Sequence, residues 1–182
     1  MAELPRGSAV VGQSGGPTVV INQSLVGVIQ AARGVRPIRR LLGARHGVRG
    51  MRENDFVDLD RLSPAFLERL AQTPAAALGS TRDKPDAEYC KAIFAVFAAN
   101  DVRYFFYIGG NDSADTTRII SELAARAGYE LRAFHIPKTI DNDLRATDHC
   151  PGYGSAARFV ACAVMGDDRD NASLPGIKID VI

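Results

Sequence analysis

Four short stretches of the sequence combine glycines, hydroxyls and charged side chains next to apolar segments. They are residues 12–18 (GQSGGPT), 78–84 (LGSTRDK), 108–116 (IGGNDSADT) and 137–143 (PKTIDND). The last one sets a lysine and two aspartates around a threonine, directly after LRAFHI, which we expect to be a buried strand. Carboxylates and ammonium groups are costly to bury unless they are paired or bind an ion or ligand. This stretch is therefore solvated, mutually neutralised or functional.

The first two stretches suit phosphate. Gly15 and Gly16 let backbone amides approach an anion closely, and the helix expected after them would offer its positive end. A tight turn between strand and helix explains these glycines equally well, and the stretch is neither a Walker loop nor a GxGxxG fingerprint. Arg82 and Lys84 could clamp phosphate oxygens, with a plain surface turn as the alternative.

The third stretch suits a hard cation. Asn111, Asp112 and Ser113 offer oxygen atoms, and the two glycines before them remove side-chain obstruction. The alternative is that Asp112 or Ser113 only caps the helix that follows.

Strand-like and helical patterns alternate along the chain and must position these stretches. Strands are expected at 8–13, 38–45, 102–110, 131–136 and 176–182, and helices at 18–33, 63–71, 86–100, 114–128 and 154–167. Ser63 and Pro64 form a helix start, and residues 46–60 are expected to be loops with a short strand or turn. This alternation predicts an α/β fold, a mostly parallel, doubly wound (Rossmann-like) sheet with helices on both faces.

Ligands of such sheets bind at the carboxyl ends of the strands. We expect all four stretches to meet there, and one phosphate compound with a metal ion explains them together. The net charge of +1 gives no reason to expect nucleic acid or an anionic membrane as a partner, and the arginines between residues 33 and 52 are interpreted as a solvated face. We expect one domain over residues 1–182 in a soluble cytoplasmic protein without a membrane span.

The cysteines support the same compartment. Cys90, Cys150 and Cys162 are odd in number and lack CxxC spacing, so we expect reduced, partly buried thiols rather than disulfides or a zinc site.

Five co-linear motifs resemble the phosphofructokinase family, and most closely its pyrophosphate-dependent branch. They are GGPTVVINQSLVGVI, GSTRDK, GGNDSADT, PKTIDND and TDHCPGYGSAARFVA. The resemblance covers nearly the whole chain. It implies magnesium-assisted transfer of a phosphoryl group from pyrophosphate to the 1-hydroxyl of fructose 6-phosphate.

The resemblance also implies roles for residues. Gly15 and Gly16 would cradle the donor phosphates, Arg82 would hold them by charge, and Asp112 and Ser113 would line the donor site. Asp141 would be the general base that takes the proton from the sugar hydroxyl, and Thr139 would contact the transferring phosphoryl group. Asp143 would lie beside Mg²⁺ and the sugar. Asn111 stands where much of the family has the aspartate associated with magnesium, so its amide oxygen would have to serve instead.

Lys138 and Asp112 would select the donor. Both correspond to glycine in the ATP-dependent branch, so the resemblance implies that Asp112 repels the α-phosphate of ATP and Lys138 neutralises pyrophosphate. The alternatives are an ATP-dependent phosphofructokinase and a non-catalytic phosphate-binding or regulatory module.

The family's sugar-phosphate contacts come mostly from a second domain that would follow Ile182. We therefore expect this chain to resemble the amino-terminal half of the enzyme. By itself it would be inactive and would associate as a homo-oligomer or with a complementary chain.

Overall fold

The computed structural model describes residues 4–174, which form a five-stranded sheet in the order β3-β2-β1-β4-β5. The pairs β1·β2, β1·β4 and β4·β5 are parallel, and only β3 runs antiparallel to its neighbour β2. The strands are β1 (Gly7–Gln13), β2 (Ile38–Ala44), β3 (Phe56–Asp58), β4 (Val102–Gly109) and β5 (Arg132–Pro137). The mostly parallel α/β fold is therefore confirmed. The strand predicted at 176–182 lies outside the described residues.

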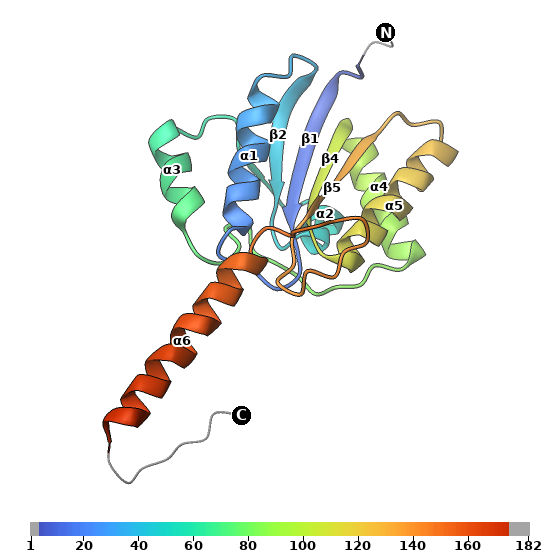
Figure 1. The fold of residues 1–182 in the computed structure, drawn as a ribbon. Helices are drawn as coiled ribbons and strands as arrows, with labels where there is room; N and C mark the ends of the chain where they lie inside the picture. Colours follow the sequence, from blue (N-terminus) through green and yellow to red (C-terminus); the bar gives the residue numbers. More distant parts are fainter. Residues whose placement is uncertain (1–3, 175–182) are drawn as a thin grey trace.

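Helices cover both faces of the sheet (Figure 1). α1 (Ile21–Arg33) and α3 (Pro64–Gln72) pack on one face, and α2 (Val48–Glu53), α4 (Ala87–Ala99) and α5 (Asn111–Arg126) pack on the other. Side chains of β1 alternate between the two layers, since Ala9 and Val11 join the cluster under α1 whereas Val10 joins the cluster under α4. The two cores thus share one strand.

Two of the predicted helix starts are fixed by side-chain caps. The Ser63 hydroxyl accepts a hydrogen bond from Phe66 N, with Pro64 in the first helical position. The Asp86 carboxylate accepts a bond of 2.8 Å from Tyr89 N at the start of α4. The caps therefore settle where α3 and α4 begin.

One prediction about the elements and two about burial were wrong. Residues 48–53 form α2 rather than a loop, because Val48 and Met51 anchor one face of this short helix in the core. The strand before PKTIDND is not buried, since β5 is the last strand of the sheet within residues 4–174 and Phe134 is 46% exposed. Cys162 is exposed, whereas Cys90 and Cys150 are buried.

The last described helix, α6 (Tyr153–Ser173), projects away from the sheet (Figure 1). It extends beyond the predicted end at residue 167, and none of its residues is buried. Across residues 4–174, no helix has both the length and the apolar character needed to cross a membrane.

Candidate active site

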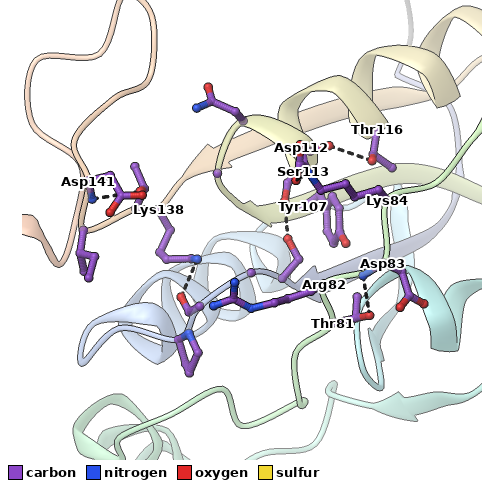
Figure 2. A pocket seen from close by; sticks show the side chains of 18 of the residues that line it. Thr81, Arg82, Asp83, Lys84, Tyr107, Asp112, Ser113, Thr116, Lys138 and Asp141 are labelled. Carbon is purple, nitrogen blue, oxygen red and sulfur yellow. Dashed lines mark hydrogen bonds and ion pairs between the residues drawn. The ribbon is translucent and has the colours of Figure 1, made fainter.

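A cleft of about 500 Å³ opens where β1, β4 and β5 end (Figure 2). Its walls come from the segment after β1, the segment after β4, the segment after β5 and the loop of residues 79–86, here called the Arg82 loop. The four stretches singled out in the sequence therefore meet, as expected for an open parallel sheet. All the residues proposed for the site line this cleft: Gly15, Gly16, Arg82, Asn111, Asp112, Ser113, Lys138, Thr139, Asp141 and Asp143.

The floor of the cleft is a group of hydroxyls from Ser14, Ser113 and Tyr107, of which only Ser113 was predicted as a site residue. Ser14 Oγ and Ser113 Oγ are hydrogen bonded to each other, and both side chains are buried. Burial raises the pKa of Tyr107 to about 12, so its hydroxyl, which lines the cleft beside Ser14, stays neutral. A side chain at Gly109 would collide with both serines. No sequence signal marks Ser14 and Tyr107, because a serine directly after a strand and a tyrosine in a strand are individually unremarkable in type and position.

Lys138 places a buried ammonium group in the cleft. Its Nζ donates to Gly16 O at 2.7 Å, as Figure 2 shows, and only 3% of the residue is exposed. Burial lowers the pKa of Lys138, the nearby Arg82 lowers it further, and Asp141 acts in the opposite direction. Gly15 has φ +73°, and a Cβ there would lie 3.1 Å from Lys138 Nζ, so glycine makes room for the lysine.

Two further cations come from the Arg82 loop. Arg82 passes close to Gly16, where a Cβ would lie 3.5 Å from its guanidinium. Lys84 Nζ lies 3.3 Å from Asp112 Oδ2, and both side chains are exposed. This ion pair joins the Arg82 loop to the first turn of α5 across the cleft.

The helix end that faces the cleft belongs to α5. Its N-cap is Gly110, without a side-chain capping bond, so the alternative of a cap by Asp112 or Ser113 is wrong. Residues 110–113 line the cleft, and the first backbone N–H groups of a helix carry partial positive charge. Among the described lining residues none belongs to α1, so the expected contribution of that helix to the anion site is not found.

Two of the acidic residues in the cleft, Asp141 and Asp143, lie on the wall formed by the segment after β5. Asn111 Nδ2 donates to Asp143 Oδ2 at 2.9 Å, and Thr139 Oγ1 accepts from Asp141 N at 3.1 Å. Within residues 4–174, no cluster of three or more His, Cys, Asp or Glu side chains has the geometry to hold a metal ion. Mg²⁺ uses one or two carboxylates together with water and substrate phosphates, so the Asp143 carboxylate and the Asn111 amide oxygen fit its donor chemistry.

Comparison with known proteins identifies the family. Residues 8–175 match the family described as Phosphofructokinase. The chain belongs to the phosphofructokinase family. Among its relatives, the pyrophosphate–fructose 6-phosphate 1-phosphotransferase of Rhodospirillum rubrum is 56% identical over 177 residues, which is 97% of this chain and 44% of that protein. The enzyme of the same name from Xanthomonas campestris is 44% identical over 94% of this chain and 42% of its own length.

A solved phosphofructokinase shows the same fold. The crystal structure of pyrophosphate-dependent phosphofructokinase from Nitrosospira multiformis superposes with a TM-score of 0.87 at 43% identity, over 92% of this chain and 42% of that one. The chain thus spans less than half the length of the phosphofructokinases it matches.

Proposed function

We propose that this chain carries the donor-phosphate site of a pyrophosphate-dependent phosphofructokinase. The reaction is transfer of a phosphoryl group from pyrophosphate to the 1-hydroxyl of fructose 6-phosphate, giving fructose 1,6-bisphosphate and phosphate. The observation that carries this proposal is the buried ammonium of Lys138, bonded to Gly16 O in a cleft that also holds Arg82 and Lys84. Three cations around a glycine turn suit a small, highly charged anion.

Each residue of the cleft has a distinct part in the proposed reaction. Arg82 and Lys138 hold the oxygens of pyrophosphate, with Gly15 and Gly16 allowing close approach of the backbone. Asp141 is the general base for the sugar hydroxyl, and Thr139 contacts the transferring group. Phosphoryl transfer depends mainly on positioning and charge neutralisation, which this set of residues supplies.

Magnesium belongs to the proposal as well. Asp143 and Asn111 would hold the ion, which would supply further neutralisation of phosphate charge when bound. Asp141 and Asp143 both line the cleft, and in this proposal they face the sugar hydroxyl.

The donor is pyrophosphate rather than ATP because of the charge distribution in the cleft. Asp112 lies in the first turn of α5 and lines the cleft beside Ser113, where its carboxylate opposes the inner phosphate of a nucleotide. Lys138, whose ammonium group lies next to Gly15 and Gly16, attracts pyrophosphate.

The wider setting of the enzyme follows from this proposal. Residues 1–182 form one donor-binding domain, which works in the cytoplasm as a homo-oligomer or with a complementary chain. The net charge of +1 favours small anionic substrates over nucleic acid or a membrane surface.

A chimera tests the activity directly. The segment of the Rhodospirillum rubrum relative that this chain matches is replaced by this chain, and the purified protein is assayed with fructose 6-phosphate and either pyrophosphate or ATP. We expect turnover with pyrophosphate and little with ATP. The matched control is the same chimera with Asp141→Asn, which should fold but lose activity.

The possible failures differ in meaning. Turnover only with ATP would replace the proposal by the ATP-dependent alternative. A folded chimera that binds pyrophosphate without turnover would support a non-catalytic phosphate-binding module.

A further inference from the structure

The Arg82 loop has no helix or strand of its own, although it delivers two cations to the cleft. It is held at its start by the bond from Gly15 N to Thr81 O, 3.0 Å long, and the Ser80 hydroxyl donates to Gly15 O. It ends at Asp86, the cap of α4. Arg82 and Lys84 lie between these anchors, and Asp83 separates them.

Asp83 is bound by side chains from outside the cleft. Arg49 of α2 donates to its two carboxylate oxygens, from Nη2 at 3.0 Å and from Nε at 3.3 Å. The Tyr89 hydroxyl of α4 donates to the same carboxylate at 3.1 Å. Arg52 of α2 lies over the Tyr89 ring, 4.4 Å from its centroid, and so completes the group.

We propose that Arg49 and Tyr89 are positioning residues for the donor site, acting through Asp83 on the two cations beside it. The inference rests on the proposed function, because it assigns these residues to pyrophosphate binding. Neither Arg49 nor Tyr89 lines the cleft, whereas Asp83 does.

The first effect is on position. A fork of two parallel hydrogen bonds fixes both the distance and the orientation of a carboxylate. When the Asp83 side chain is held, the backbone of its two neighbours is held as well. The Arg82 and Lys84 side chains therefore extend into the cleft from restrained backbone positions. A loop held in this way loses less conformational entropy when it closes on an anion.

The second effect is on charge. The hydrogen bond from Arg49 is the main reason why the pKa of Asp83 lies below its ordinary value, so this carboxylate is ionised at neutral pH. An unpaired carboxylate between Arg82 and Lys84 would repel the phosphates that these residues attract. Arg49 therefore neutralises the Asp83 carboxylate. This is the negative charge that the Arg82 loop places in the cleft, between the cations of Arg82 and Lys84.

Isothermal titration with pyrophosphate measures both effects together. Arg49→Gln should weaken pyrophosphate binding by about two- to fivefold, the upper part of the range expected from a partly exposed ion pair. Arg45→Gln is the matched control, because Arg45 lies close by in the sequence, is similarly exposed and pairs with Asp55, which does not line the cleft. The control should bind pyrophosphate as the unaltered chain does.

A second change separates charge from position. Arg49→Gln with Asp83→Asn removes the unpaired carboxylate without restoring the fork. We expect this double variant to recover part of the lost affinity. Recovery would identify the charge effect, which a general loss of folding would not produce.

Trypsin reports on position without any ligand. Within the Arg82 loop it can cut after Arg82, whereas the bond after Lys84 is protected by Pro85. Arg49→Gln, the double variant and Tyr89→Phe should all be cut faster after Arg82 than the unaltered chain, and Arg45→Gln should not. Mass spectrometry identifies the cut.

The outcomes distinguish failure of the positioning role of Arg49 from failure of the proposed pyrophosphate-binding function. If Arg49→Gln binds pyrophosphate and resists trypsin like the unaltered chain, the positioning role is wrong. If the unaltered chain fails to bind pyrophosphate, the proposed function and the charge effect fail, while faster cleavage of Arg49→Gln would still establish Arg49 as the anchor of the loop.

Discussion

Replacing Lys138 by methionine isolates the buried charge that the donor proposal depends on. Methionine is close to lysine in length and apolar volume, so Lys138→Met removes the ammonium group with little change in packing. The residue is 3% exposed, and within residues 4–174 its ammonium group donates a hydrogen bond to Gly16 O at 2.7 Å. The change therefore removes one cation and one hydrogen bond.

The magnitude for binding follows from the chemistry of this cation. A hydrogen bond to a charged group contributes about 1.5–3 kcal/mol, which corresponds to roughly a 10- to 150-fold change in a binding constant. Arg82 and Lys84 remain in the cleft and retain part of the attraction. We therefore expect the affinity for pyrophosphate to fall by about 10- to 100-fold.

Folding stability should respond differently. The lowered pKa of Lys138 means that the folded protein holds the charged form at a cost, which burial causes first and Arg82 increases. Losing the bond from the charged ammonium to Gly16 O removes about 1.5–3 kcal/mol, and relieving the buried charge, which costs several kcal/mol to desolvate, offsets this loss. The free energy of unfolding at neutral pH should thus change by less than about 1 kcal/mol.

The pH dependence has a defined sign. Because the pKa of Lys138 in the folded protein lies below its ordinary value of 10.5, the unfolded chain binds more protons between these two values. The contribution of Lys138 to stability therefore rises with pH through that window, whereas its contribution to pyrophosphate binding falls. Lys138→Met should lack both trends.

Calorimetric titration with pyrophosphate from neutral to alkaline pH, together with thermal unfolding, measures all of these quantities. Lys138→Met titrated over the same range corrects for the ionisation of pyrophosphate itself. The reasoning is refuted if the variant binds pyrophosphate as tightly as the unaltered chain, or if affinity is lost only together with folding.

Three further predictions concern chemistry, donor choice and folding. In the chimera, Asp141→Asn should lower turnover by about two to four orders of magnitude, the range for a positioned general base, with much smaller effects on substrate affinity; survival of turnover within a few-fold would place the base elsewhere. Changing Asp112 and Lys138 together to glycine should narrow the preference for pyrophosphate over ATP in paired kinetic assays, and an unchanged ratio would show that other residues choose the donor. Ser63→Ala should cost about 1 kcal/mol in chemical denaturation, since Ser63 caps α3, whereas Ser63→Gly should cost only a few tenths; equal losses would contradict a capping role.

Much of the fold could be predicted because its signals are local. The start of the helix could be predicted from two adjacent residues, Ser63 and Pro64. The buried strand predicted at 102–110 could be recognised from one continuous apolar run. The helix at 48–53 could not be predicted, because three glycines between residues 43 and 50 weaken the pattern and its stability comes from tertiary burial of Met51. The exposure of β5 depends on its place at the sheet edge, which no local pattern records.

The candidate site also has a part that could be predicted from the sequence and a part that could not. Convergence of the four stretches follows from sheet topology, and the structure shows it. The hydroxyl floor of Ser14, Ser113 and Tyr107 and the fork between Arg49 and Asp83 depend on residues far apart in the sequence. Such pairs become visible only when the chain is folded. The roles of the lining residues stay predictions until variants are measured.

The projection of α6 has a consequence for how the protein unfolds. None of the 21 residues of α6 is buried, so this helix lacks the tertiary burial from which most helices in proteins gain their stability. Its free energy of opening should therefore be set by local helix propensity, separately from that of the sheet. Backbone amides in α6 should exchange with solvent long before those of β1 and β4. The sheet and its covering helices should unfold cooperatively, whereas α6 should unfold locally and independently of them.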